Sequence, residues 1–178
     1  MGTRLVSNAI VVMGVSGSGK STIGSAMARR LGFEFIEGDQ LHSAQNIERM
    51  ASGHALTDEE RLPWLNLVGA AMARSLLEQP GVVAACSALK RSYRDVLRQH
   101  VPDAYFVWLD GQIATIHARV LARPGSFLPS SLLASQFADL EPLAADETGM
   151  RVEATLHPDQ IVAAVLGAIT VEAPVSPS

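Results

Sequence analysis

The chain has 178 residues, 48% of them apolar, which suffices for one substantial core in a single domain. Its net charge of −4 gives no sign of a surface for nucleic acid or for a membrane. A single cysteine, Cys86, excludes an internal disulfide and a thiolate metal cluster. The first eight residues are too short and too polar for a signal peptide, so we expect a cytoplasmic protein.

Apolar runs alternate with helical patterns along the chain. The expected strands are residues 9–13, 33–37, 82–86, 105–109 and 149–154. The expected helices are residues 21–31, 45–50, 57–78, 92–99, 113–122, 131–140 and 158–171. Because most strands are apolar without strict alternation, we predict an α/β fold of three layers, a parallel sheet with helices on both faces. One domain spans residues 1–172, and residues 173–178 are predicted to be a disordered tail.

Residues 14–21 read Gly-Val-Ser-Gly-Ser-Gly-Lys-Ser and match the phosphate-loop pattern G-x-x-x-x-G-K-[ST] in full. A buried strand is expected before them and a helix after them. The glycines let successive backbone N–H groups point at phosphate oxygens, and the helix adds its positive N-terminal end. We expect Lys20 to reach the β- and γ-phosphates of ATP and Ser21 to hold Mg²⁺. The other predicted nucleotide ligands in this stretch are Gly14, Ser16, Gly17, Ser18, Gly19 and Thr22.

The rarity of lysine in this chain also favours a functional role for Lys20. The chain has twelve arginines but only two lysines, Lys20 and Lys90, so each retained lysine favours a chemical role.

The phosphate loop alone does not separate kinases from GTPases or motor ATPases. The guanine-reading pattern Asn-Lys-x-Asp is absent, and we attribute the Asp-x-x-Gly match at residues 146–149 to chance. The strand at 82–86 ends without an aspartate, so the usual second metal ligand is missing and Ser21 is the only clear direct protein ligand for Mg²⁺. Small-molecule kinases of the nucleotide-monophosphate type tolerate that absence.

An acceptor site is predicted where the second strand ends, because ligands of such sheets lie beyond the carboxyl ends of the strands. Asp39 could accept the proton of a substrate hydroxyl, orient that hydroxyl, or hold a magnesium-bound water. It could also be a simple turn residue after Gly38. His42 could bind a hydroxyl or serve only as a residue at a helix N-terminus.

A mobile lid is predicted at about residues 123–131, where two prolines flank a short loop. Arg119 and Arg123 lie four apart at the end of the preceding helix, on one face. They could reach over ATP and neutralise charge on the transferring phosphoryl group, which makes Arg123 a catalytic candidate beside Lys20 and Asp39. The alternative is a helix C-terminus with favourable cations. Gln136, in the next helix, could close over substrate or nucleotide.

Several longer motifs resemble the gluconokinases. They are Asp39-x-x-His42, Asn46 to Gly53, Leu56 to Trp64, Cys86-Ser-Ala-Leu-Lys-Arg-Ser-Tyr-Arg94, Gln136-Phe137, Leu140-Glu141 and Glu147-Thr148. The resemblance covers roughly residues 10–148 and implies ATP-dependent phosphorylation of D-gluconate to 6-phospho-D-gluconate, which feeds the pentose phosphate pathway. It also implies a fold like that of nucleotide-monophosphate kinases, and often a homodimer. The family usually carries Gly-His-Phe in the lid, where this chain has Pro124 and Ser126 nearby, which puts a lid histidine in doubt.

Gluconate carries one carboxylate and many hydroxyls, so its site needs a cation together with polar partners. The predicted cations are Arg49, Lys90 and Arg91, and Ser87 is a candidate hydrogen-bond donor. Asp58, Glu59 and Arg61 look like capping and surface charge, and Trp64 like a core residue.

Two alternatives stay open at this point. One is a related kinase for shikimate or another sugar acid, against which the block from Cys86 to Arg94 argues. The other is a regulatory protein that binds nucleotide without a small acceptor.

Overall fold

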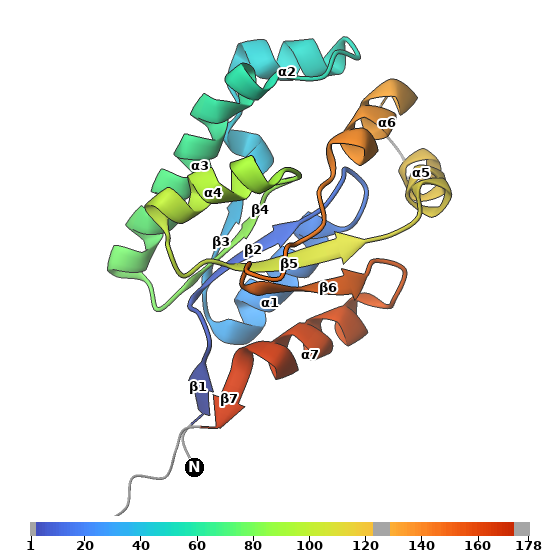
Figure 1. Cartoon of the computed structure of the whole chain (residues 1–178). Coiled ribbons are helices and arrows are strands. Elements are labelled where there is room, and N and C mark those ends of the chain that lie inside the picture. The colour runs from blue at the N-terminus through green and yellow to red at the C-terminus, as the bar shows by residue number, and fades with distance from the viewer. Residues whose placement is uncertain (1–2, 123–128, 173–178) are drawn as a thin grey trace, which may run out of the picture.

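A computed structural model of the chain describes residues 3–122 and 129–172 (Figure 1). Its centre is a five-stranded parallel sheet in the order β3-β4-β2-β5-β6. The strands are β2 (Ala9–Met13), β3 (Glu34–Glu37), β4 (Val82–Ala85), β5 (Tyr105–Asp110) and β6 (Gly149–Glu153). The predicted parallel sheet is therefore confirmed, and the strand order is new, because a hydrophobic pattern does not encode which strands pair.

Helices cover both faces of the sheet, as predicted. On one face lie α1 (Lys20–Leu31) and α7 (Pro158–Ile169), and on the other lie α3 (Asp58–Glu78) and α4 (Arg91–His100). The remaining helical elements are the short 3-10 helix η1 (Gly38–Leu41), α2 (Ala44–Ala51), α5 (Ile113–Ala122) and α6 (Ser130–Asp139). The site is built from the turns at the carboxyl ends of these strands.

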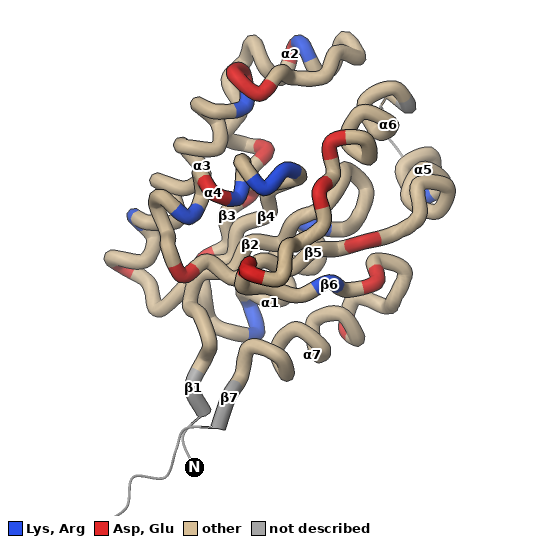
Figure 2. Tube along the Cα trace, viewed as in Figure 1, with Lys and Arg blue, Asp and Glu red and all other residues tan. Residues whose placement is uncertain are grey.

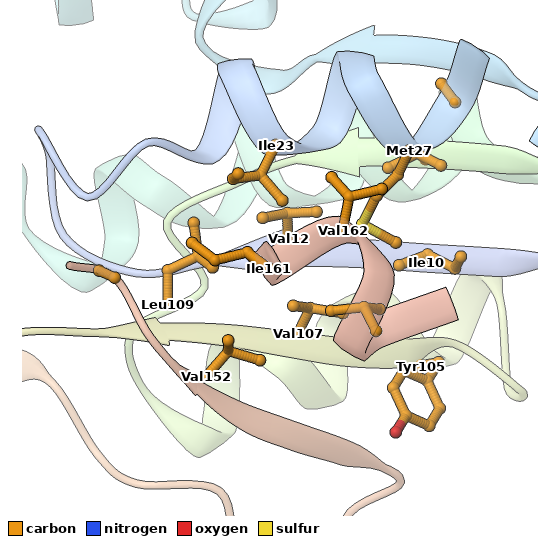
Figure 3. Close-up of a cluster of buried hydrophobic side chains, with 14 of the residues drawn as sticks. Ile10, Val12, Ile23, Met27, Tyr105, Val107, Leu109, Val152, Ile161 and Val162 are labelled. Atoms are coloured by element: carbon orange, nitrogen blue, oxygen red, sulfur yellow. The ribbon is translucent and has the colours of Figure 1, made fainter. Parts of the chain in front are cut away.

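The central strand β2 is buried on both sides, which explains its unbroken apolar sequence. Ile10 and Val12 point to the layer of α1 and α7, where Figure 3 shows them beside Ile23 and Met27. Val11, with the other odd-numbered residues of the strand, packs instead with the α3 and α4 cluster. Because side chains on both faces of β2 are packed in the core, the strand is a rigid support for the loop that follows it.

Helix α3 begins with the predicted capping box. The Thr57 hydroxyl accepts from the Glu60 N–H at 3.3 Å, and the Thr57 N–H donates to the Glu60 carboxylate at 2.8 Å. These bonds satisfy two donors at the helix start. They therefore define where α3 begins.

The structure differs from the prediction at the chain ends. Residues 3–5 form β1 (Thr3–Leu5), which pairs antiparallel with β7 (Thr170–Glu172). The predicted last helix therefore ends at Ile169 instead of continuing to residue 171. Strands of three residues are too short to show a period, so no sequence pattern predicts this pair. Within the described ranges, no helix is long and apolar enough to cross a bilayer.

Candidate active site

The phosphate loop connects β2 to α1 and has a backbone that only glycine adopts easily. Gly14, Gly17 and Gly19 have φ angles of 144°, 83° and 102°. A Cβ atom on Gly14 would lie 2.7 Å from the Leu109 carbonyl oxygen, and one on Gly17 would collide with Val120. The glycines thus allow the loop to lie tightly against the ends of its neighbours, with its N–H groups available for an anion.

Lys20 is the first residue of α1 and is only 9% exposed. Its Nζ atom donates to the Val15 carbonyl at 3.0 Å, so the side chain curls back over the loop. Burial lowers the pKa of Lys20, and the negative charge of Asp39 opposes that change. A buried ammonium group within a phosphate loop is placed to bind phosphate oxygens.

A cavity of about 630 Å³ opens beside this loop. Residues 16–23, Asp39, Arg119 and Val120 line it, together with Ala154, Leu156, Pro158 and Ile161 from the segment after β6. The volume lies in the range of small-molecule sites, roughly 300–1,000 Å³. The lining joins polar groups of the loop with apolar side chains, a combination that suits the phosphates and the base of a nucleotide.

Of the two arginines predicted to lie beside the lid, Arg119 and Arg123, the structure describes only the first. Arg119 lines the cavity, and its Nη1 atom donates to the Ala154 carbonyl at 2.6 Å. Arg123 and most of the predicted lid lie outside the described residues. Gln136 of α6 reaches the phosphate loop, where its Oε1 atom accepts from the Ser16 N–H at 2.6 Å.

The acceptor side is organised around Trp64 of α3. Its Nε1–H donates to the Gly38 carbonyl at 2.7 Å, and its ring stacks on His42. Gly38 directly precedes Asp39, which is exposed and lines the cavity. Trp64 is a core residue, 2% exposed, as predicted, and it also fixes both predicted acceptor residues.

His42 has an unsatisfied ring nitrogen. Its Nδ1 atom is buried without a hydrogen-bond partner among the described residues. Burial lowers the pKa of His42, Asp39 opposes this, and the positive charge of Arg61 adds to it. A neutral imidazole beside a carboxylate suits a hydroxyl-rich ligand.

The three predicted acceptor cations are all engaged with carboxylates. Arg49 lies 3.3 Å from Glu60, Lys90 lies 2.8 Å from Asp58, and the Arg91 guanidinium binds Asp146 through two bonds of 2.9 and 3.0 Å. Lys90 also lies 3.4 Å from Asp139, and Arg91 lies 3.1 Å from Asp95. Basic and acidic residues accordingly lie close together around the start of α4 (Figure 2). Their role as substrate ligands stays a prediction.

Arg61 corrects the sequence interpretation, which placed it among surface charges. It is 5% exposed, and its Nε atom donates to the Leu56 carbonyl at 3.3 Å. Its guanidinium carbon lies 5.8 Å from the centre of the Tyr93 ring. Among the residues that the structure describes, Arg61 has no carboxylate within ion-pair distance and no bond from its two terminal nitrogens.

The sequence pattern of α3 predicts the burial of Arg61. Arg61 stands in register with Trp64, Leu65, Val68 and Met72, at the spacing of one helix face. All of these side chains are buried. An arginine within an apolar stripe is a candidate for a buried, functional cation rather than a solvated one.

Ser87 lies at the carboxyl end of β4, between the two halves of the site. It is 8% exposed, and its carbonyl accepts from the Gly14 N–H at 3.2 Å. The turn after β4 therefore touches the phosphate loop directly.

A magnesium site of the kind that the sequence predicts is compatible with this arrangement. Ser21 and Asp39 both line the cavity. Within the described part of the chain, no three His, Cys, Asp or Glu side chains gather into a metal site. Mg²⁺ commonly uses one or two protein ligands together with substrate phosphates and water, so the residues fit such an ion.

Known proteins share this sequence and fold. The thermosensitive gluconokinase of Escherichia coli K12 is 46% identical over 143 residues, covering 80% of this chain and 76% of that protein. The chain belongs to the gluconokinase family. A solved gluconokinase from Sinorhizobium meliloti 1021 is 43% identical, with a TM-score of 0.84 over 93% of each chain.

A wider group of kinases shares the fold of this family. The shikimate kinase family model matches residues 16–131. The shikimate kinase of Aquifex aeolicus has a TM-score of 0.60 at 18% identity, over 90% of this chain and 95% of that one. That likeness concerns the fold, and the predicted nucleotide-monophosphate-kinase-like architecture is confirmed.

Proposed function

We infer that the protein is a gluconokinase, which transfers the γ-phosphoryl group of ATP to a hydroxyl of D-gluconate and yields 6-phospho-D-gluconate. The observation that carries this beyond family membership is the buried cation Arg61, which has no carboxylate partner among the described residues, near Asp39 and His42. A cation, a carboxylate and an imidazole on one side of a phosphate loop match an acceptor with one carboxylate and several hydroxyls.

The nucleotide binds in the cavity beside the phosphate loop. The loop N–H groups and Lys20 bind the β- and γ-phosphates, while Val120, Leu156 and Pro158 contact the base. Arg119 adds positive charge at the same cavity. Catalysis of phosphoryl transfer is mostly positioning and charge stabilisation, and these residues supply both.

Magnesium is the expected metal partner of ATP here. We propose that Ser21 binds it directly and that Asp39 contacts it through water, as the lining of the cavity allows. When bound, the ion neutralises charge on the phosphate oxygens.

The acceptor carboxylate binds Arg61, whose planar guanidinium matches a carboxylate through two parallel bonds. Asp39 then faces a hydroxyl near the phosphate loop and orients it for attack on the γ-phosphorus. His42 binds a further hydroxyl through its imidazole. Because Arg61 binds the carboxylate and Asp39 orients the attacking hydroxyl, the distance between these two residues selects an acceptor of matching length.

ADP release tests this function. The wild-type protein is incubated with ATP and Mg²⁺ and with gluconate, shikimate, glycerate or glucose in turn. We expect release with gluconate at least tenfold above that with any other acceptor. Preference for shikimate or glycerate would select the related-kinase alternative, and release independent of any acceptor would select a nucleotide-binding protein of another kind.

The homodimer and the cytoplasmic location that the sequence suggests stay predictions. The first is checked by light scattering on the purified chain, and the second by fractionation of cells that express it.

A further inference from the structure

Ala88 has a backbone conformation that is rare for a residue with a side chain. Its φ angle is 42°, and among the described residues it alone has a positive φ without being glycine. It is completely buried in the turn that follows β4. Such strain persists only where the surroundings impose it, and it gathers at functional sites.

Arg94 of α4 imposes this conformation. The side chain is fully buried, and its Nη1 atom donates to the Ala88 and Leu89 carbonyls at 3.2 and 3.0 Å. On its other side it donates to the Glu141 and Pro142 carbonyls at 3.2 and 3.3 Å. One guanidinium therefore clamps the turn after β4 against the segment after α6.

Glu147 holds Arg94 in place. Two bonds of 2.7 and 2.8 Å join the side chains, and both side chains are 0% exposed. Glu147 also accepts from the Ala144 N–H at 2.9 Å and from Arg98 at 2.6 Å. The pair and its bonds to backbone carbonyls stabilise the fold, so a positioning role needs a readout other than stability.

The clamped turn borders both halves of the site. The Ser87 carbonyl accepts from Gly14 of the phosphate loop at 3.2 Å. On the acceptor side, Gly38 lies so close to the Ala85 carbonyl that a Cβ atom there would collide with it. The Ser87 N–H has no backbone partner among the described residues, and Ser87, 8% exposed, is the residue of this turn within reach of a ligand, because Ala88 and Leu89 are 0% exposed.

We propose that Arg94 and Glu147 are positioning residues that hold the turn at Ser87–Leu89 in its left-handed form, so that Ser87 stays against the phosphate loop with its N–H available to an acceptor hydroxyl. The inference rests on the proposed function. The pair acts through the turn and does not touch the substrate. Its role is to keep the acceptor half of the site correctly positioned relative to the phosphate loop.

The variant Ala88→Gly separates positioning from stability. Glycine adopts the left-handed backbone without strain, so the melting temperature should stay the same or rise. Because glycine needs no clamp to hold this conformation, adding Ala88→Gly to the variant Arg94→Met with Glu147→Leu should lower the raised KM for gluconate of that variant at least threefold. No recovery of the KM for gluconate on adding Ala88→Gly would overturn the proposal.

A second variant removes the clamp itself. Arg94→Met combined with Glu147→Leu replaces the ion pair by apolar side chains and leaves the carbonyls of the turn without a donor, so we expect a folded protein with a lowered melting temperature, which circular dichroism checks. We expect kcat/KM for gluconate to fall at least tenfold. The control is Ile169→Val, which disturbs a fully buried residue at the far end of α7.

The outcomes separate this inference from the function on which it rests. If the double variant loses no more activity than Ile169→Val at equal melting temperature, the pair is merely structural and the positioning role is refuted. Wild-type protein without gluconate-dependent turnover would overturn the proposed function, and this inference with it. Active wild type with selectively weakened variants supports both.

Discussion

His42 lies flat against Trp64, with ring centroids 4.1 Å apart and ring planes at 14°. The same indole donates its N–H to the Gly38 carbonyl at 2.7 Å. Because Gly38 precedes Asp39, one buried ring of α3 orients both proposed acceptor residues that follow β3. The proposed acceptor half of the site thus depends on the packing of a single tryptophan.

Replacing Trp64 by phenylalanine should weaken the site more than the fold. The variant loses one buried hydrogen bond, about 1 kcal/mol of unfolding free energy, and a smaller ring supports His42. We expect the KM for gluconate to rise severalfold in steady-state assays. The control is Trp108→Phe, because the Nε1 atom of Trp108 is buried without a partner among the described residues and its removal costs no bond. Equal KM values in both variants would refute the role of Trp64.

Arg61→Gln should raise the KM for gluconate about tenfold or more, since a hydrogen bond to a charged group contributes about 1.5–3 kcal/mol. The unfolding free energy should change little or increase, because the variant removes a buried cation that lacks a carboxylate partner among the described residues. Arg49→Gln is the matched control, as Arg49 is exposed and paired with Glu60. If Arg49→Gln shows the larger change in KM, the carboxylate binds on α2 and the assignment of Arg61 is wrong.

Lys20→Ala should lower kcat by about a hundredfold to a thousandfold, the usual effect of removing one donor to a developing charge. The fold should be retained, because burial already lowers the pKa of this lysine and its charged form is costly. Turnover and thermal melting of the same preparation check both expectations. Normal turnover by a folded variant would contradict the role of Lys20.

Glu147 gives the protein a defined sensitivity to acid. Burial alone would raise the pKa of Glu147, but hydrogen bonds from Arg94, the Ala144 N–H and Arg98 outweigh it and lower the pKa from 4.5 to about 2. A carboxyl whose folded pKa is depressed stabilises the fold above its unfolded pKa and loses that contribution as the pH falls through the folded value. The contribution at neutral pH is on the order of 3 kcal/mol.

Urea unfolding between pH 7 and pH 2.5 measures this contribution. Wild-type protein should lose stability below about pH 4.5, near the unfolded pKa of the carboxyl. Glu147→Gln should be less stable at neutral pH and should lose less as the pH falls. Parallel pH profiles for the two proteins would show that other groups control the acid transition.

The sequence predicted the features that local patterns encode. The phosphate loop, the strand β2 and the capping box at Thr57 all lie within short stretches whose residue types determine their structure. Contacts between distant segments were not predictable. The partners of Lys90 and Arg91, Asp58 and Asp146, stand 32 and 55 residues away, so the ion pairs around these cations appear only in the fold.

For Arg61, helical spacing predicts burial better than charge does. Its charge suggested solvent, while its spacing from Trp64 and Leu65 indicated the buried face of α3. The spacing predicted the burial of Arg61 correctly, because the position of a residue in the helical repeat determines which face of the helix it occupies. The strain at Ala88 has no such signal, since alanine is an ordinary choice for a turn beside a strand.

The most direct measurement is the phosphorus NMR spectrum of the product formed from ATP and D-gluconate. Transfer to the primary hydroxyl of gluconate predicts a new phosphomonoester resonance that the two protons on its carbon split into a triplet. A doublet would place the phosphoryl group on a secondary hydroxyl. A doublet, or ATP consumption that yields only inorganic phosphate, would contradict the account.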